Sequence, residues 1–94
     1  MDYEKAFTTF DGVFIREKIW DSNHLSLNEK LIISVIEQFA DNKTFDWSNK
    51  EISNFCFIGQ TSVSTAINKL CALRYIKIKS FDGRKRVIEV LYKE

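Results

Sequence analysis

Two groups of side chains suited to binding a polyanion lie in the second half of the 94-residue chain. The first group is a series of small polar residues ending in a cation: Gln60, Thr61, Ser62, Ser64, Thr65, Asn68 and Lys69. The second is a basic cluster, Arg84, Lys85 and Arg86, preceded by Lys77 and Lys79. Hydroxyl and amide groups can hydrogen-bond base edges and phosphate oxygens, and cations neutralise phosphates. These residue types therefore fit contact with a nucleic acid.

The charge of the chain is distributed unevenly along the sequence. The net charge is +1, but residues 1–59 carry six Lys or Arg against ten Asp or Glu, and residues 60–94 carry eight against three. An acidic first part thus precedes a basic second part, and a polyanion would meet the basic part. A solvated charged surface would give the same count, so charge alone does not separate the two interpretations.

No constellation of residues indicates catalysis, a metal site or a cofactor site. His24 is the single histidine and has no Asp or Cys at ligand spacing. Cys56 and Cys71 stand where apolar residues are expected, and we interpret them as small buried thiols in a reducing cytoplasm. The chain has three glycines but no glycine-rich phosphate loop, and it offers no nucleophile–base pair. We expect a protein that is not an enzyme and that takes no metal and no cofactor.

Two capping boxes mark the elements that must position the polar groups. Ser26 with Glu29, and Ser48 with Glu51, have the Ser-x-x-Glu spacing in which each side chain bonds the other residue's backbone N–H. The first box starts a helix with the apolar stripe Leu27, Leu31, Ile32, Val35, Ile36 and Phe39. The second starts a short helix expected to bury Ile52, Phe55 and Cys56. The residues between them, 44–47, alternate in polarity and suit a very short strand.

A third helix is predicted from about Gln60 to Leu73, after a break at residues 57–59. Its inward stripe is Val63, Ala66, Ile67, Leu70 and Leu73, which leaves the small polar residues facing outward. From Tyr75 onward the period changes to two, and Asp82-Gly83 separates two β-prone runs. Asp-Gly in this position predicts a hairpin, because glycine readily adopts the positive φ of the turn. The predicted order is helix, short strand, helix, tight turn, helix, hairpin.

Residues 1–24 are interpreted as an N-terminal arm and residues 25–94 as one domain. Within the arm, residues 13–15 form a short β-prone run, and residues 16–20 fit either a strand end or a helical turn. The chain has no apolar run of the roughly 18 residues needed to span a membrane, and its first residues lack the order of a secretion signal. We therefore expect a cytoplasmic protein with no membrane partner.

From about Leu25 to Tyr92 the chain resembles the winged helix-turn-helix family of small bacterial and phage DNA-binding domains. The matching segments are Ile52–Cys56 in the second helix, Ile58–Val63 in the turn and the start of the third helix, and Ala66–Leu70 followed by Tyr75–Ile78 in the first wing strand. Asp46-Trp47-Ser48 is similar to a subgroup found at the front of plasmid and phage replication proteins. The resemblance implies an α+β fold, mostly α, with a three-helix core and a C-terminal β-hairpin wing.

Three residues depart from the family pattern. Phe57 stands where a turn glycine is usual, Gly59 replaces the usual Ser or Thr helix cap, and Arg74 takes the place of the helix-ending glycine. Arg74 is therefore expected either in a left-handed conformation or in a turn of a different build. The third helix also carries one cation, Lys69, which argues against high-affinity sequence reading by this helix.

The resemblance implies binding of double-stranded DNA. The recognition helix, residues 60–73, would lie in the major groove, and the basic wing, residues 82–86, on the backbone or in the minor groove. Thr61 and Ser62 are expected to meet phosphate rather than bases. Lys77 and Lys79 are expected either to flank the same path or to protect the edge of the sheet. The module would serve replication initiation or transcriptional regulation.

The sequence leaves the oligomeric state and one alternative function open. The chain could act alone, as a homodimer or within a larger replication or transcription assembly. The alternative is a winged helix that docks other proteins and binds no DNA. The acidic first part of the chain and two aromatic residues without an obvious core position, Trp20 and Phe57, favour that alternative. Trp47 and Phe55 are instead expected in the core.

Overall fold

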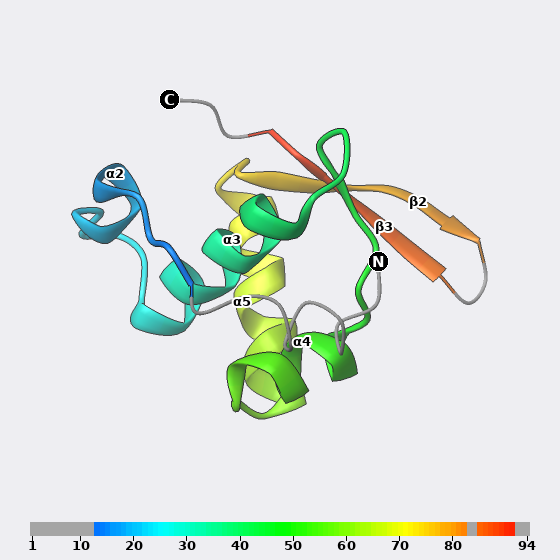
Figure 1. The fold of residues 1–94 in the computed structure, drawn as a ribbon, viewed down its shortest axis with the longest axis horizontal. Helices are drawn as coiled ribbons and strands as arrows, with labels where there is room; N and C mark the ends of the chain where they lie inside the picture. Colours follow the sequence, from blue (N-terminus) through cyan, green and yellow to red (C-terminus); the bar gives the residue numbers. More distant parts are fainter. Residues whose placement is uncertain (1–12, 83–84, 92–94) are drawn as a thin grey trace.

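The computed structural model describes residues 13–82 and 85–91, and of residues 80–82 and 85 it describes the backbone. The elements in chain order are α2 (Glu17–Trp20), α3 (Leu27–Phe39), β1 (Thr44–Phe45), α4 (Asn49–Cys56), α5 (Gln60–Ala72), β2 (Ile76–Asp82) and β3 (Lys85–Val90) (Figure 1). About half of the described residues are helical, and the strands form one antiparallel sheet in the order β1-β3-β2. The chain is therefore a small α+β domain. Over the described ranges, none of the helices is long and apolar enough to cross a membrane.

Both predicted capping boxes are present and start their helices at the expected residues. Ser26 Oγ accepts a bond from the Glu29 N–H at 3.2 Å, while Glu29 Oε1 accepts one from the Ser26 N–H at 2.8 Å. Ser48 and Glu51 repeat this exchange at 3.1 and 2.8 Å. Each box satisfies backbone donors that the first turn of a helix leaves without partners. The starts of α3 and α4 thus follow from local sequence.

The hydrophobic core lies between the helices and one side of the sheet. Its largest fully buried side chains are Trp47, Phe45, Ile19, Ile32, Ile33, Ile36, Ile52, Leu70, Ile76, Ile88, Val35 and Val63. Trp47 is the centre of an aromatic cluster, with its ring 5.2 Å from those of Phe39 and Phe45 and 5.4 Å from that of Phe55. The predicted core position of Trp47 is confirmed, whereas Phe55 is partly buried and packs against the core.

Two residues of the predicted apolar stripes are not in the core. Leu27 is 64% exposed and Leu73 is 39% exposed. Leu27 is the first residue of α3, and Leu73 caps the end of α5. The apolar period of the sequence extends to both residues, but at the ends of the helices the neighbouring elements no longer cover the side chains.

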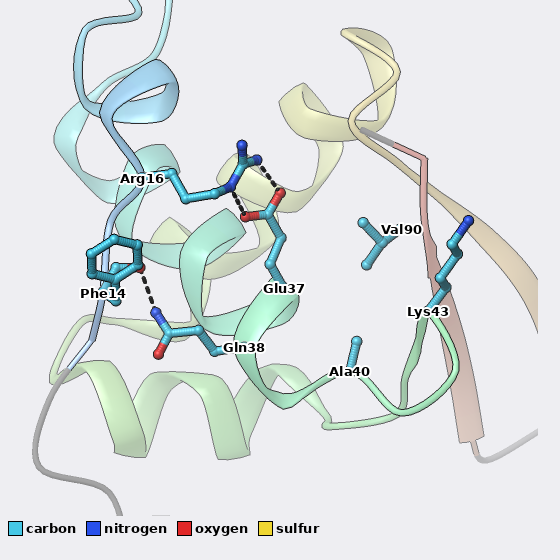
Figure 2. A pocket seen from close by; sticks show the side chains of 7 residues that line it. All are labelled: Phe14, Arg16, Glu37, Gln38, Ala40, Lys43 and Val90. Carbon is cyan, nitrogen blue, oxygen red and sulfur yellow. Dashed lines mark hydrogen bonds and ion pairs between the residues drawn. The ribbon is translucent and has the colours of Figure 1, made fainter. Parts of the chain in front are cut away.

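The segment before α3 packs on the rest of the domain. Of the two alternatives for residues 16–20, the structure forms a helix, α2, whose Ile19 is fully buried. The preceding residues 13–16 form no strand. Arg16 donates two bonds to the Glu37 carboxylate, from Nε at 3.1 Å and from Nη2 at 2.7 Å, and Gln38 Nε2 donates to the Phe14 carbonyl (Figure 2). Residues 1–12, the remainder of the predicted arm, lie outside the described residues.

Strands β2 and β3 form the predicted hairpin. Their pairing runs from Ile76 opposite Val90 to Asp82 opposite Lys85. The residues between the strands, 83 and 84, lie outside the described part. The register shifts between Ile78 and Ser80, which is a β-bulge, so the regular alternation predicted for Lys77 and Lys79 does not run the length of β2. The predicted short strand is present as β1 and pairs with the edge of β3 that faces away from β2, so β3 is the central strand of the sheet.

Helix α5 ends in the left-handed conformation that the sequence suggested for Arg74. The φ of Arg74 is 66°. Its N–H donates to the Cys71 carbonyl at 3.1 Å, and the Tyr75 N–H donates to the Leu70 carbonyl at 3.0 Å. This pair of bonds is a Schellman motif, which satisfies carbonyls at a helix end and usually uses glycine at the left-handed position. The chain is thereby turned directly into β2.

Candidate nucleic-acid interface

A tight, hydrogen-bonded turn connects α4 to α5. Phe57 ends α4 with φ 60° and ψ 41°, so it takes the left-handed conformation for which glycine would be usual. The N–H groups of Phe57 and Ile58 both donate to the Ser53 carbonyl, at 2.9 and 3.3 Å. Ser53 Oγ donates in turn to the Ile58 carbonyl at 2.5 Å. These bonds fix the direction in which α5 leaves α4.

Helix α5 has one apolar and one polar side. Val63, Ala66, Ile67 and Leu70 are at most 3% exposed and hold the helix against the domain. The predicted contact residues Gln60, Thr61, Ser62, Thr65, Asn68 and Lys69 are exposed, and Ser64 is half-buried. The structure thus brings the predicted residues of the third helix together on its solvent side. We call this set of seven residues the α5 polar face.

A shallow groove of about 190 Å³ borders the α5 polar face. It lies between the start of α3 and the first half of α5 and is lined by Ser26, Asn28, Glu29, Thr61, Ser62, Thr65 and Ala66. Glu29 is 7% exposed, and its Oε1 lies 3.6 Å from the Lys69 ammonium. The carboxylate therefore balances the charge of the single cation of the α5 polar face. Sequence reasoning assigned Glu29 to helix capping and did not anticipate this second contact.

The hairpin carries the other predicted cations. Lys77 and Lys79 are exposed on β2, and the Lys77 ammonium lies 3.4 Å from Glu89 Oε1 on β3. Lys85 opens β3 opposite Asp82, next to the end of the hairpin, but its side chain is not described. Arg84 lies outside the described residues. In Figure 1 the hairpin extends past the helices on the side where α4 begins.

Arg86 is turned back onto the protein. Its Nη1 donates to Asn49 Oδ1 at 2.5 Å, and its Nη2 donates to the Trp47 carbonyl at 2.7 Å. Burial lowers the pKa of Arg86 from its ordinary value. The charge of Arg86 also lowers the pKa of Cys71 on α5, against the larger rise caused by burial. The start of β3 therefore lies close to both α4 and α5, and the Arg86 side chain is bonded to the protein.

The single histidine and the two cysteines, the remaining groups that could react or bind a metal, lie in contact with other parts of the domain. His24 Nε2 lies 3.0 Å from the Tyr75 hydroxyl, and Tyr75 is buried. Cys56 and Cys71, which the sequence predicts as small buried thiols, are free and partly buried, and burial raises the pKa of Cys56 to about 11. Across residues 13–82 and 85–91, no three His, Cys, Asp or Glu side chains are grouped so that they could hold a metal ion.

Among the described residues, three large aromatic side chains are exposed to solvent: Phe14 (70%), Trp20 and Phe57. Trp20, the last residue of α2, is 54% exposed, and the Lys30 ammonium lies 5.1 Å from its ring centre. Phe57 is 79% exposed in the turn that leads into α5. Trp20 and Phe57 are the two aromatic residues for which the sequence gave no core position. Phe57 therefore adds an apolar surface at the border of the α5 polar face.

Comparisons of the chain with known protein families, with characterised proteins and with solved structures gave no match.

Proposed function

We propose that the chain is a winged helix-turn-helix domain that binds double-stranded DNA. Helix α5 would enter the major groove, and the β2–β3 hairpin, the wing, would lie on the flanking backbone or in the minor groove. The observation that carries the proposal is the position of α5. One side of α5 is buried in the core and the other, the α5 polar face, is exposed, directly after a bonded turn from α4. A recognition helix in such a motif is held in the same way.

The order of elements supports this fold. From α3 onward the chain runs helix, strand, helix, turn, helix and hairpin. The hairpin follows α5 directly after the Schellman turn at Arg74, so the connection between the recognition helix and the wing is short and hydrogen-bonded. A fold with this order can place a helix in one groove and a hairpin beside it.

Phosphate contacts would supply most of the affinity. Thr61 and Ser62 lie in the first turn of α5, where backbone N–H groups also favour an anion. The one cation of the α5 polar face, Lys69, is already close to Glu29. We therefore expect modest affinity that falls steeply with salt and depends on the wing. A module of this kind would serve replication initiation or transcriptional regulation.

The test is fluorescence anisotropy with a random-sequence duplex at low and at moderate salt. The variant Arg84→Gln/Lys85→Gln removes two cations next to the wing tip. If both contact phosphates, the slope of log affinity against log salt should fall by about 1.8, and affinity at low salt should drop about tenfold or more. The control Lys18→Gln/Lys43→Gln makes the same charge change at two other exposed lysines, on α2 and before β1.

The outcomes of this test differ clearly. The proposal expects the control to bind within about twofold of the unmodified protein, since no contact is lost. Absence of duplex binding by the unmodified protein at low salt would refute the proposal. Equal losses in the two double variants would show that net charge, and not the wing, attracts the DNA.

A second candidate function is docking of another protein without DNA binding. The exposure of Phe57, at the border of the α5 polar face, favours it. Exposed aromatic side chains are common in protein interfaces and have no part in phosphate contact. Under this alternative the unmodified protein binds no duplex at any salt concentration. Under the DNA proposal, Phe57→Ser leaves duplex affinity within about twofold, because no phosphate contact is removed.

A further inference from the structure

We infer that Arg86 is a positioning residue, which fastens the wing near its tip to the start of α4 and does not itself contact DNA. The inference rests on the proposed function, because it concerns how the wing would be presented to the duplex. It separates Arg86 from Arg84 and Lys85, with which it forms one basic cluster in the sequence.

Two of the five N–H donors of the Arg86 guanidinium are bonded within the protein. Its two Nη atoms donate to Asn49 Oδ1 and to the Trp47 carbonyl, at 2.5 and 2.7 Å. Its Nε atom is buried without a hydrogen-bond partner. The two bonds hold the half-buried side chain against the start of α4 and the residues just before it. Turning the guanidinium outward to a phosphate would therefore require the protein to break bonds that it has already formed.

Both acceptors belong to rigid parts of the domain. Trp47 is 1% exposed and stacks within the aromatic cluster of the core. Asn49 is the first residue of α4, next to the capping box of Ser48 and Glu51. A planar guanidinium suits two acceptors in fixed positions, whereas an ammonium group acts as a point charge. The arrangement thus links β3 to the start of the helix-turn-helix.

The pairing of the strands explains why Arg86 faces the helices. Arg86 is opposite Phe81, one step inward from Asp82 and Lys85 at the end of the hairpin. Side chains alternate between the two sides of a strand, so Arg86 shares its side with Ile88, which is fully buried. Arg86 is therefore a polar continuation of the core side of β3.

The position is electrostatically costly, which argues against an incidental contact. A helix start carries a partial positive charge, and a cation beside it is unfavourable. Partial burial of the guanidinium adds to the cost. The two bonds offset these terms. A cation that served only solubility would be displayed to solvent, as Lys79 is.

Duplex binding as a function of salt tests this inference when four variants are compared. Arg84→Gln removes a proposed phosphate contact and should lower the salt slope by about 0.9. Arg86→Gln and Asn49→Ala should each weaken binding about three- to tenfold with the salt slope unchanged, because the number of phosphate contacts stays the same. Arg86→Lys should behave like Arg86→Gln, since a lysine keeps the charge but cannot bridge both acceptors.

The unfolding free energies of the same proteins complete the test. If Arg86 and Asn49 act through one bond, the double variant Arg86→Gln/Asn49→Ala should lose no more stability and no more affinity than Arg86→Gln alone. If Arg86→Gln does not fold, the affinity, salt slope and stability of Arg86→Lys and Asn49→Ala are compared with those of the unmodified protein instead.

Two results would overturn the inference, and a third would refute the proposed function on which it rests. A lower salt slope in Arg86→Gln with normal binding by Arg86→Lys and Asn49→Ala would make Arg86 a phosphate contact. Reduced stability with unchanged affinity would give the bridge a purely structural role. Failure of the unmodified protein to bind duplex would refute the proposed function itself, while the Arg86–Asn49 coupling in stability would still report whether the bridge exists.

Discussion

Positive backbone φ angles at non-glycine residues create local strain in this chain. Asn42, Lys43, Phe57 and Arg74 all have φ between 53° and 66°. For residues with a Cβ this conformation costs roughly 1–2 kcal/mol, and Asn tolerates it best. At Phe57 and Arg74 the conformation is imposed by the turns on either side of α5. The chain therefore accepts strain in order to hold α5 between α4 and the hairpin.

Replacing Arg74 by glycine should stabilise the protein. Arg74 is exposed, and glycine would remove the strain while keeping both bonds of the Schellman motif. After subtraction of the extra entropy of glycine in the unfolded chain, we expect a gain of about 0.5–1 kcal/mol. Urea denaturation measures it. Arg74→Ala is the control, because it removes the same side chain without relieving the strain, and a glycine variant no more stable than the alanine variant would contradict the explanation.

The Cys56 thiol should make the stability depend on pH under alkaline conditions. Burial raises its pKa from 9.0 to about 11. Between these values the unfolded chain has lost the thiol proton and the folded chain has kept it, so stability falls as pH rises from about 9 to about 11. Denaturation curves across this range for the protein and for Cys56→Ala measure the effect. An identical decline in both proteins would show that this thiol contributes nothing.

At the residue scale, the sequence predicts the members of the α5 polar face but not the long-range contacts of the cations Lys69 and Arg86. The face follows from helical period, which needs only neighbouring residues. The contacts of Lys69 with Glu29 and of Arg86 with Asn49 join residues far apart in the chain, and no local pattern encodes them. Consequently a uniform basic cluster at residues 84–86 was expected, whereas Arg86 faces α4.

Among the elements, α3 and α5 form the contact that most affects the proposed interface. Their packing places the Glu29 carboxylate beside Lys69 and next to the groove at the border of the α5 polar face. The same carboxylate closes the capping box of α3. One side chain thus stabilises the start of a helix and reduces the positive charge of its neighbour. It should therefore limit the affinity for DNA.

The variant Glu29→Gln should bind duplex DNA more tightly. Glutamine can still close the capping box, so α3 should form as before. Lys69 would lose its counter-charge and become available to a phosphate, which should raise affinity at low salt about threefold or more and steepen the salt slope by up to about 0.9. Anisotropy titrations at several salt concentrations give both quantities.

Glu17→Gln on α2 is the matched control for this effect, because it makes the same charge change at an exposed residue outside α3 and α5. It should leave the salt slope unchanged. An equal gain in the two variants would mean that net charge alone is responsible. No gain in Glu29→Gln would mean that Lys69 lies outside the interface.

The helices were the most predictable elements and the sheet was the least. Capping boxes at Ser26 and Ser48 are local signals, and both helices begin where these signals indicate. The hairpin was also predicted, from Asp82-Gly83. The bulge near Lys79 and the pairing of β1 with β3 depend on packing against the finished core, and local sequence does not determine them.

At the scale of the whole molecule, the β2–β3 hairpin and the two helices α4 and α5 are parts of one structure. Arg86 joins β3 to α4 through Asn49, the Schellman turn joins α5 to β2, and β1 pairs with β3 just before α4 begins. The parts proposed to touch DNA are therefore held in a fixed relation by bonds within the described residues. Such preorganisation lowers the entropic cost of binding. The central claim of the account is that helix and wing bind one duplex together.

Amide chemical-shift mapping by NMR tests this claim most directly. Labelled protein is titrated with a random-sequence duplex at low salt, and shifts are followed for every backbone amide. The account predicts that the largest changes fall in residues 60–69 and around the wing tip in the same titration step, while α2 and the second half of α3 change little. Changes confined to other elements, or none at saturating duplex, would contradict it.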